Sequence, residues 1–505
     1  MNYNRNNEVE IHKTPIQRFY DGQSIFITGS TGFLGKILIE KLLRSCPDIS
    51  TLYLLIRPKK DKCPESRLND IFKISLFDRL RKEVPNFRKK VVPIIGNLDV
   101  EDLGLFENDK NILMREVSIV FHLAATLRFD EKIKIATTIN VMSTNTILNI
   151  AKHMSNLKSF IYVSTLYAHC HDKSTLIEER FYTYPVDYRD FITSMRASPE
   201  NDEKLSRMAS LWPNTYTCTK AITEILLRDK GKNLPIGIFR PAMVTLSANE
   251  PIAGWGDNLY GPIGSTISIL LGFTRFQWCD PDITANLVPV DFTVNALIAS
   301  AWDVSNQYRT EKQDILIYNN TTAPNAPTWS EYINKIICLN QKYPLKDSMW
   351  LPFIFLVPKQ ITYKIGIWFC HLLPAFLVDS IRICTGHRPR MWKLYSKIHK
   401  AIQSIAYFSI TRWQFADDNV QTMWNRLNKE DQQLFPFNIR ELDWTKYLID
   451  FHQGIRLYFL NEDDSNLEIS RINYSRLYWK HKVFKTVLIF FTVWIIWIIF
   501  VKIFA

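Results

Sequence analysis

A tyrosine and a lysine stand four positions apart in the segment PNTYTCTKAITE, residues 213–224, at Tyr216 and Lys220. On a helix, residues at this spacing share a face. An ammonium group beside a phenol stabilises the phenolate, so Lys220 is expected to lower the pKa of Tyr216 from its usual value of about 10. Tyr216 is then predicted to donate a proton to a carbonyl oxygen under reduction. Lys220 is also predicted to hold the ribose of a nicotinamide cofactor.

Two hydroxyl side chains end a predicted strand upstream of this pair. The run SFIYVST, residues 159–165, is apolar up to Ser164 and Thr165. Either hydroxyl could hydrogen-bond the substrate oxygen beside Tyr216, and we slightly favour Thr165. The alternative for each is that it only caps the next turn.

A glycine triplet precedes these residues in ITGSTGFLG, residues 27–35. Gly29 permits a tight turn, Gly32 lets the backbone approach a pyrophosphate, and Gly35 allows close packing of helix on strand. The triplet follows an apolar run and opens a helical pattern, which places the pyrophosphate at a helix N-terminus. This context predicts dinucleotide binding.

The end of the second apolar run selects between the two nicotinamide cofactors. An acidic residue there holds the ribose 2′-hydroxyl of NAD. This chain has Arg57 instead, followed by Lys59 and Lys60. A guanidinium pairs with a 2′-phosphate and stacks on adenine, which favours NADPH. The alternative is a solvated basic turn.

Strands that are apolar throughout must position these residues. Such runs alternate with helical patterns and predict a Rossmann-type, doubly wound parallel sheet of the α/β class, covered by helices on both faces. The predicted strands are 24–29, 51–57, 90–96, 118–125, 159–165 and 235–241. From about residue 345 the pattern is helical.

The most apolar segment lies at residues 483–504, VFKTVLIFFTVWIIWIIFVKIF, with no charge between Lys485 and Lys502. As a helix it would be about 33 Å long, enough to span a bilayer core. Basic residues at 476, 480 and 482 favour a cytosolic position for the preceding chain. A shorter apolar stretch, residues 365–378, is expected to be a buried helix or an element that dips into one monolayer, rather than a span.

These patterns divide the chain of 505 residues into consecutive parts. The predicted parts are a polar lead at 1–21, a Rossmann domain with a substrate-binding extension at 22–345, a helical C-terminal domain at 346–465, a linker at 466–482 and a transmembrane helix at 483–504. With 47% hydrophobic residues the chain is not disordered. Its formal net charge of +12 suggests an anionic partner. Nucleic acid is the weakest candidate, because the basic residues are spread out.

The eight cysteines form no CxxC pair, and we predict reduced thiols and no metal site. The polar N-terminal stretch shows no cleaved signal peptide. Together with the apolar tail, this predicts folded domains in the cytosol held by a C-terminal anchor.

The chain resembles the fatty acyl-CoA reductases of the extended short-chain dehydrogenase/reductase superfamily, the arthropod members most closely. The resemblance runs from about Thr14 to the C-terminus. It is carried by ITGSTGFLGK, YLLIRPKK, FHLAATLRFDE, YVSTLYAH, WPNTYTCTKA, FRPAMV, EPIAGWGDNLYGP, RWQFADDN and YLIDFHQGIR. So many ordered matches are more specific than either short motif.

The resemblance implies that NADPH reduces a long-chain acyl-CoA to a primary alcohol through an aldehyde, with release of CoA. Tyr216 would act on the carbonyl oxygen, aided by Thr165 or Ser164. The residues expected to bind the cofactor are Gly29, Ser30, Thr31, Gly32, Phe33, Leu34, Gly35, Arg57, Asn97, Leu98, Ala124, Ala125, Tyr216, Lys220 and Pro241. Asn97 stands where the family has Asp, and its amide can keep a hydrogen bond to adenine.

Three alternatives remain open from the sequence: a membrane-bound dehydrogenase of a sterol or similar alcohol, a reductase that stops at the aldehyde, and a non-catalytic NADPH-binding scaffold. The intact Tyr216–Lys220 pair argues against the scaffold. We expect contact with membrane lipid, and attachment to the endoplasmic reticulum rather than the peroxisome. Acyl chain length and homo-oligomer formation are left open.

Overall fold

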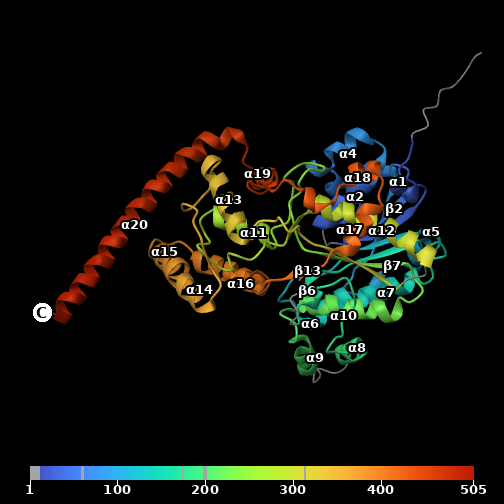
Figure 1. Ribbon diagram of the computed structural model, residues 1–505, viewed down its shortest axis with the longest axis horizontal. Helices are drawn as coiled ribbons and strands as arrows, with labels where there is room; N and C mark the ends of the chain where they lie inside the picture. Colours follow the sequence, from blue (N-terminus) through green and yellow to red (C-terminus); the bar gives the residue numbers. More distant parts are fainter. Residues whose placement is uncertain (1–11, 59–61, 173–175, 197–201, 312–313, 505) are drawn as a thin grey trace, which may run out of the picture. The chain divides into compact units, whose positions relative to one another are not determined.

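The computed structural model describes residues 12–58, 62–172, 176–196, 202–311 and 314–504, which form two compact units (Figure 1). Unit 1 holds the described residues up to Val244, with Val288–Thr322 and Gln414–Glu441. Unit 2 holds Thr245–Leu287, Ala323–Trp413 and the described residues from Leu442 onward. The chain therefore passes between the units several times, whereas the sequence predicts domains that follow one another.

Unit 1 is built on a seven-stranded sheet in the order β11-β7-β5-β4-β1-β2-β3, in which all neighbours are parallel. The strands are β1 Ser24–Thr28, β2 Thr51–Ile56, β3 Val91–Ile95, β4 Ile119–His122, β5 Ser159–Val163, β7 Ile236–Pro241 and β11 Leu316–Asn320. All six predicted strands are present. The seventh, β11, was not predicted.

The central strands are apolar because both faces of the sheet are covered. Every residue of β1, β4, β5 and β7 is buried. Figure 1 shows α2 and α12 on one side of the sheet and α7 and α10 on the other. The doubly wound parallel fold predicted from the sequence is therefore confirmed.

The helices of unit 1 are α1 Pro15–Tyr20, α2 Phe33–Ser45, α3 Pro64–Phe72, α4 Asp78–Glu83, α5 Glu107–Glu116, α6 Ile133–Thr137, α7 Ser143–Ala151, α8 Tyr188–Arg196, α9 Asp202–Ala209, α10 Thr215–Lys230, α12 Val290–Glu311, α17 Asp418–Arg426 and α18 Lys429–Leu434. A short pair joins β6 Leu176–Ile177 to β13 Gln414–Phe415. This pairing returns a late part of the chain to unit 1.

Unit 2 is mainly helical. Its helices are α11 Pro262–Leu270, α13 Trp329–Lys342, α14 Gln360–Ile367, α15 Leu373–Cys384, α16 Met391–Ile410, α19 Trp444–Gly454 and α20 Leu467–Phe504. Within it, β9 Phe276–Trp278 pairs with β12 Phe355–Val357 in parallel. Two further short strands, β8 Met243–Thr245 and β10 Leu287–Pro289, lie at the boundaries of the units.

The last helix, α20, contains the segment that is expected to cross a membrane. It runs for 38 residues from Leu467, so nearly all of the predicted linker at 466–482 is helical. The helix can include this stretch because no glycine or proline, the residues that most disfavour a helix, follows Gly454 in the chain. By length and composition, two helical stretches could cross a membrane, Asp464–Phe504 and Gln360–Cys384, and the most apolar window of the first has no buried residue.

The second stretch has two different sides. Tyr363, Ile367 and His371 are buried within unit 2. Trp368 and Phe376, in contrast, are more than half exposed, as are the other apolar side chains of that side: Ile361, Ile365, Phe369, Leu377, Ile381 and Ile383. The sequence predicts either a buried helix or an element that dips into one monolayer. The structure has features of both, because this stretch is buried on one side and exposes apolar side chains on the other, its open side.

Candidate active site

The glycine turn between β1 and α2 has no room for side chains. Gly29 adopts a φ of +72°, and a Cβ there would lie 2.9 Å from the backbone nitrogen of Ala124. A Cβ on Gly35 would lie 2.2 Å from the carbonyl oxygen of Gly29. Gly32 is the N-cap of α2 and has no side chain to cap the helix, which leaves the helix N-terminus open to an anion. These features fit a dinucleotide pyrophosphate.

The remaining residues of the turn flank this N-terminus. Ser30 is buried, and its hydroxyl donates to the carbonyl oxygen of Leu55 in β2 (3.0 Å). Thr31, Phe33 and Leu34 are partly exposed around the turn. The turn is therefore fixed to the neighbouring strand while its outer residues remain accessible.

The other predicted cofactor residues follow neighbouring strands at the same edge of the sheet. Arg57 comes directly after β2 and is exposed, and Asn97 and Leu98 come after β3 and are partly exposed. Ala124 and Ala125 follow β4; the amide of Ala124 donates to the Thr28 hydroxyl (3.2 Å). Pro241 ends β7. Lys59 and Lys60 lie outside the described residues.

Tyr216, Lys220 and Thr165 come together where β5 meets α10. Asn214 caps α10, and its side chain accepts from the amide of Thr217 (2.9 Å). The hydroxyl of Thr165 is near enough to the Tyr216 phenol to act on its pKa, which it lowers. The Nζ of Lys220 donates to the carbonyl oxygen of Val163 (2.6 Å) and lies 6.0 Å from the centroid of the Tyr216 ring. A hydroxyl pair and an ammonium group are therefore assembled at one site.

Ser164 has a different environment from Thr165. Its hydroxyl donates to Oε1 of Glu224, and the residue is 1% exposed. Thr165 also caps the short helix Leu166–His169, since its hydroxyl oxygen accepts from the amide of Tyr167 (3.3 Å). The two hydroxyls that the sequence could not separate thus have different surroundings: that of Ser164 is bonded to Glu224, and that of Thr165 acts on the pKa of Tyr216.

The titration behaviour of the pair differs from the sequence-based expectation. Burial raises the pKa of Tyr216 above its ordinary value, and the Thr165 hydroxyl offsets this only in part. Burial lowers the pKa of Lys220 to about 7, while the Glu224 carboxylate acts to raise it. The prediction that Lys220 lowers the pKa of Tyr216 is therefore wrong for this arrangement. Tyr216 stays a neutral phenol, which is the form that donates a proton.

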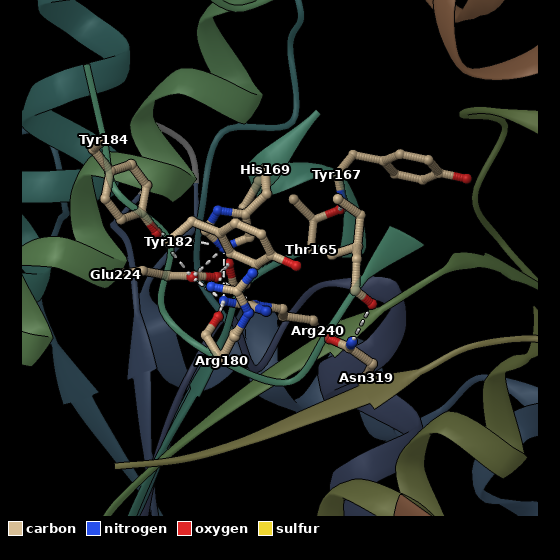
Figure 2. Close-up of polar contacts among 12 residues, drawn as sticks. Thr165, Tyr167, His169, Arg180, Tyr182, Tyr184, Glu224, Arg240 and Asn319 are labelled. Atoms are coloured by element: carbon tan, nitrogen blue, oxygen red, sulfur yellow. Dashed lines mark hydrogen bonds and ion pairs between the residues drawn. The ribbon is translucent and has the colours of Figure 1, made fainter. Parts of the chain in front are cut away.

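Sequence reasoning missed a group of charged and polar residues behind this site. Figure 2 shows His169, Tyr184 and Arg240 converging on the carboxylate of Glu224. Nη2 of Arg240 lies 2.6 Å from Oε2 of Glu224, and both side chains are fully buried. Glu224 and Arg240 stand inside segments that the sequence already singled out. The pattern that could have identified Glu224 is its position four residues after Lys220, which repeats the spacing between Tyr216 and Lys220.

Asn140 is a second residue that the sequence did not assign. It is 1% exposed and lies in the helical segment Thr138–Met142. Its Oδ1 accepts from the amide of Thr126 (2.8 Å), and its Nδ2 donates to the hydroxyl of Thr219 on α10 (2.9 Å). Asn140 therefore ties the segment after β4 to the helix that carries Tyr216 and Lys220.

A glycine turn for a dinucleotide, together with a Tyr-x-x-x-Lys helix at the carboxyl edge of a parallel sheet, defines a nicotinamide-dependent oxidoreductase of the extended short-chain dehydrogenase/reductase class. Residues 27–297 match the family described as "Male sterility protein", and residues 370–462 match a second family with the same description.

Relatives at higher identity cover nearly the whole chain. "Fatty acyl-CoA reductase wat" of Drosophila melanogaster is 39% identical, over 92% of this chain and 89% of its own. "Fatty acyl-CoA reductase 1" of Homo sapiens is 36% identical, over 96% of this chain and 93% of its own. The chain belongs to the fatty acyl-CoA reductase family, as the sequence indicates.

The solved structures support the fold alone, because their sequences are distant. The terminal R domain of the myxalamid PKS-NRPS pathway matches with a TM-score of 0.60 and 17% identity, over 86% of this chain and 90% of that domain. The reductase domain of a nonribosomal peptide synthetase from Mycobacterium tuberculosis matches with a TM-score of 0.56 and 18% identity, over 87% of this chain and 93% of that domain.

Proposed function

We propose that this protein reduces long-chain fatty acyl-CoA to a primary alcohol with NADPH, at the site formed by Tyr216, Lys220 and Thr165. The single observation that carries the proposal is the buried Lys220, which is bonded to the carbonyl of Val163 just before Thr165 and lies 6.0 Å from the centroid of the Tyr216 ring, on a chain of this family. Its relatives named as fatty acyl-CoA reductases supply the substrate class.

The residues act on the carbonyl oxygen of the thioester. NADPH, when bound, supplies the hydride that reduces the carbonyl carbon. The hydroxyls of Tyr216 and Thr165 hydrogen-bond the oxygen on which charge develops, and Tyr216 gives it a proton. The resulting hemithioacetal breaks its carbon–sulfur bond, the thiolate of CoA takes up a proton, and an aldehyde remains. Once Tyr216 has regained a proton from solvent and the oxidised cofactor has been exchanged for a second NADPH, the same residues would protonate the aldehyde oxygen as its carbon takes up the second hydride, which would give the alcohol.

NADPH is the proposed cofactor because of Arg57. The residue is exposed directly after β2, where the adenine ribose lies in this fold. Its guanidinium can pair with a 2′-phosphate, which NADH lacks. Asn97, after β3, would hydrogen-bond the adenine. The glycine turn accepts the pyrophosphate of either cofactor and does not discriminate between them.

We propose further that α20 anchors the protein in a membrane through residues 483–504, with both units in the cytosol. The side chains of this part are exposed and apolar, and Lys480, Lys482 and Lys485 lie at its start. The open side of the 360–384 stretch would rest on the same lipid surface, since it is apolar and Arg388 and Arg390 follow it, both exposed. The endoplasmic reticulum is the proposed membrane.

The test compares Tyr216→Phe with the wild-type protein in microsomes, using palmitoyl-CoA or stearoyl-CoA and NADPH. The variant loses only the phenolic hydroxyl, so turnover should fall by about 10²–10⁴-fold while NADPH binding is kept. Binding is measured by the quenching of protein fluorescence. Full turnover by the variant, or no aldehyde and no alcohol from the wild type over a panel of chain lengths, would contradict the proposal.

A further inference from the structure

Glu224 lies on the same helix as the proposed catalytic pair, one turn beyond Lys220 and two turns beyond Tyr216. It is fully buried. Oε1 accepts from the hydroxyl of Ser164 and from Nε of Arg240 (3.0 Å), and Oε2 accepts from Nη2 of Arg240 (2.6 Å). Burial acts to raise the pKa of Glu224, but Arg240 and His169 together outweigh it and hold the pKa well below the ordinary value. The carboxylate is therefore ionised.

The far side of the carboxylate is closed by aromatic rings. Nε2 of His169 lies 2.9 Å from Oε2, and the hydroxyl of Tyr184 donates to the same oxygen (3.4 Å). The His169 ring stacks on Tyr182 with its centroid 4.6 Å away. Burial lowers the pKa of His169 to about 4, so the ring is neutral. Figure 2 shows this group around Glu224, with Thr165 at its edge.

Three consecutive residues at the end of β5 each contact a different turn of α10. The carbonyl of Val163 accepts from Lys220, the hydroxyl of Ser164 donates to Glu224, and the hydroxyl of Thr165 is near enough to Tyr216 to act on its pKa. Successive residues of an extended chain point in opposite directions, so a shift of the strand end would break more than one of these contacts. Glu224 is also held by Arg240 of β7, so it ties α10 to two neighbouring strands of the sheet.

Glu224 also opposes the effect of burial on the pKa of Lys220. The ammonium lies 4.6 Å from the centroid of the Tyr162 ring on β5, and His122 on β4 faces it. Burial raises the pKa of Tyr162 well above its ordinary value and lowers the pKa of His122 to about 3, so both are neutral near pH 7. Tyr216 is neutral too. Among the described groups that face Lys220, Glu224 carries the nearest charge, and Arg240 lies behind it.

We infer that Glu224 is a positioning residue for the reduction: it fixes the end of β5 against α10 through Ser164, and it places a buried negative charge one helical turn from Lys220. The inference rests on the proposed roles of Tyr216 and Lys220. It goes beyond them in assigning a function to a residue that is fully buried behind the proposed catalytic pair. Glu224 acts through Ser164 on the placement of Thr165, and through the electric field on the protonation of Lys220.

The experiment measures kcat and KM against pH for the full-length protein with palmitoyl-CoA and NADPH. In the wild type, kcat should fall as pH rises above about 7, because the buried Lys220 loses its proton there. Glu224→Gln keeps the shape of the side chain and removes its charge. For this variant the fall of kcat at high pH, here called the alkaline limb, should occur at a pH lower by roughly one to three units than in the wild type. The KM for acyl-CoA should change little.

Ser164→Ala is the matched variant, because it removes one contact of Glu224 and leaves the charge in place. It should lower kcat by the same factor at every pH, and its alkaline limb should lie at the same pH as in the wild type. Glu224→Asp keeps the charge and should keep the limb as well. A merely structural role for Glu224 would lower the amount of folded enzyme and would not move the limb.

Glu224→Gln leaves the buried Arg240 without its carboxylate, which is costly for folding. The double variant Glu224→Gln, Arg240→Met removes both charges and supplies the same comparison, with NADPH binding as the check on its fold. An alkaline limb that coincides with the wild type in folded variants lacking the carboxylate would overturn the inference. Failure of the proposed function is a separate result, because it would show as full turnover by Tyr216→Phe.

Discussion

The assignment of Thr165 over Ser164 as the hydroxyl beside Tyr216 yields a sharp prediction. Thr165→Val keeps the shape of the side chain and removes the hydroxyl that lowers the pKa of the Tyr216 phenol. Loss of one donor to a developing oxyanion costs about 10²–10³-fold in kcat. The amide of Tyr167 loses its acceptor as well, and since that bond is long, at 3.3 Å, we expect a cost of about 1 kcal/mol in stability.

The assay is steady-state oxidation of NADPH at saturating palmitoyl-CoA, together with the thermal midpoint of each variant. Thr165→Ser restores the hydroxyl and should recover most of the rate. Ser164→Ala should lower kcat by less than roughly tenfold, because it removes one hydrogen bond from Glu224 and no contact with Tyr216. The reverse order, a large loss for Ser164→Ala and a small one for Thr165→Val, would refute the assignment.

Three further predictions concern the cofactor and the anchor. Gly35→Ala places a Cβ against the Gly29 carbonyl and should raise the KM for NADPH at least about tenfold, measured by initial rates. An unchanged KM would show that the turn can rearrange to admit the Cβ. Arg57→Glu should invert the preference between NADPH and NADH, measured as the ratio of kcat/KM for the two, and an unaltered ratio would remove Arg57 from the 2′-phosphate. Ile496→Lys puts a charge near the middle of the exposed apolar part of α20, at about 2.5–3.5 kcal/mol of insertion free energy. More of this variant should be released by alkaline carbonate extraction than of the wild type, whereas equal retention would contradict the anchor.

The sequence was sufficient for the sheet because its strands are buried on both faces. A run such as residues 159–163 is apolar throughout and stands between helical patterns, so its identity as a parallel strand follows from composition. The strand β11, LIYNN, was not predicted because its polar end is buried: Nδ2 of Asn319 donates to the carbonyls of Ile177 and Ala416. Those side-chain amides are satisfied by tertiary contacts, and such contacts cannot be predicted from the local sequence.

The candidate site was predictable where one short segment carries it and not where distant segments meet. The turn at Gly29–Gly35 and the pair Tyr216–Lys220 are local patterns. The pairing of Ser164 with Glu224 joins residues 60 positions apart, and that of Arg240 with His169 joins residues 71 apart. The expected effect of Lys220 on Tyr216 failed for the same reason, since burial by the surrounding fold raises the pKa of the phenol.

The central claim is the reduction of acyl-CoA to alcohol, and stoichiometry tests it most directly. Purified full-length protein is given stearoyl-CoA and NADPH, and three quantities are measured together: NADPH oxidised, CoA thiol released and alcohol formed. The account predicts two NADPH oxidised for each CoA released and each alcohol formed, with no aldehyde accumulating. One NADPH for each CoA, with free aldehyde as the product, would contradict the alcohol-forming sequence, and NADPH oxidation without release of CoA would contradict acyl-CoA as the substrate.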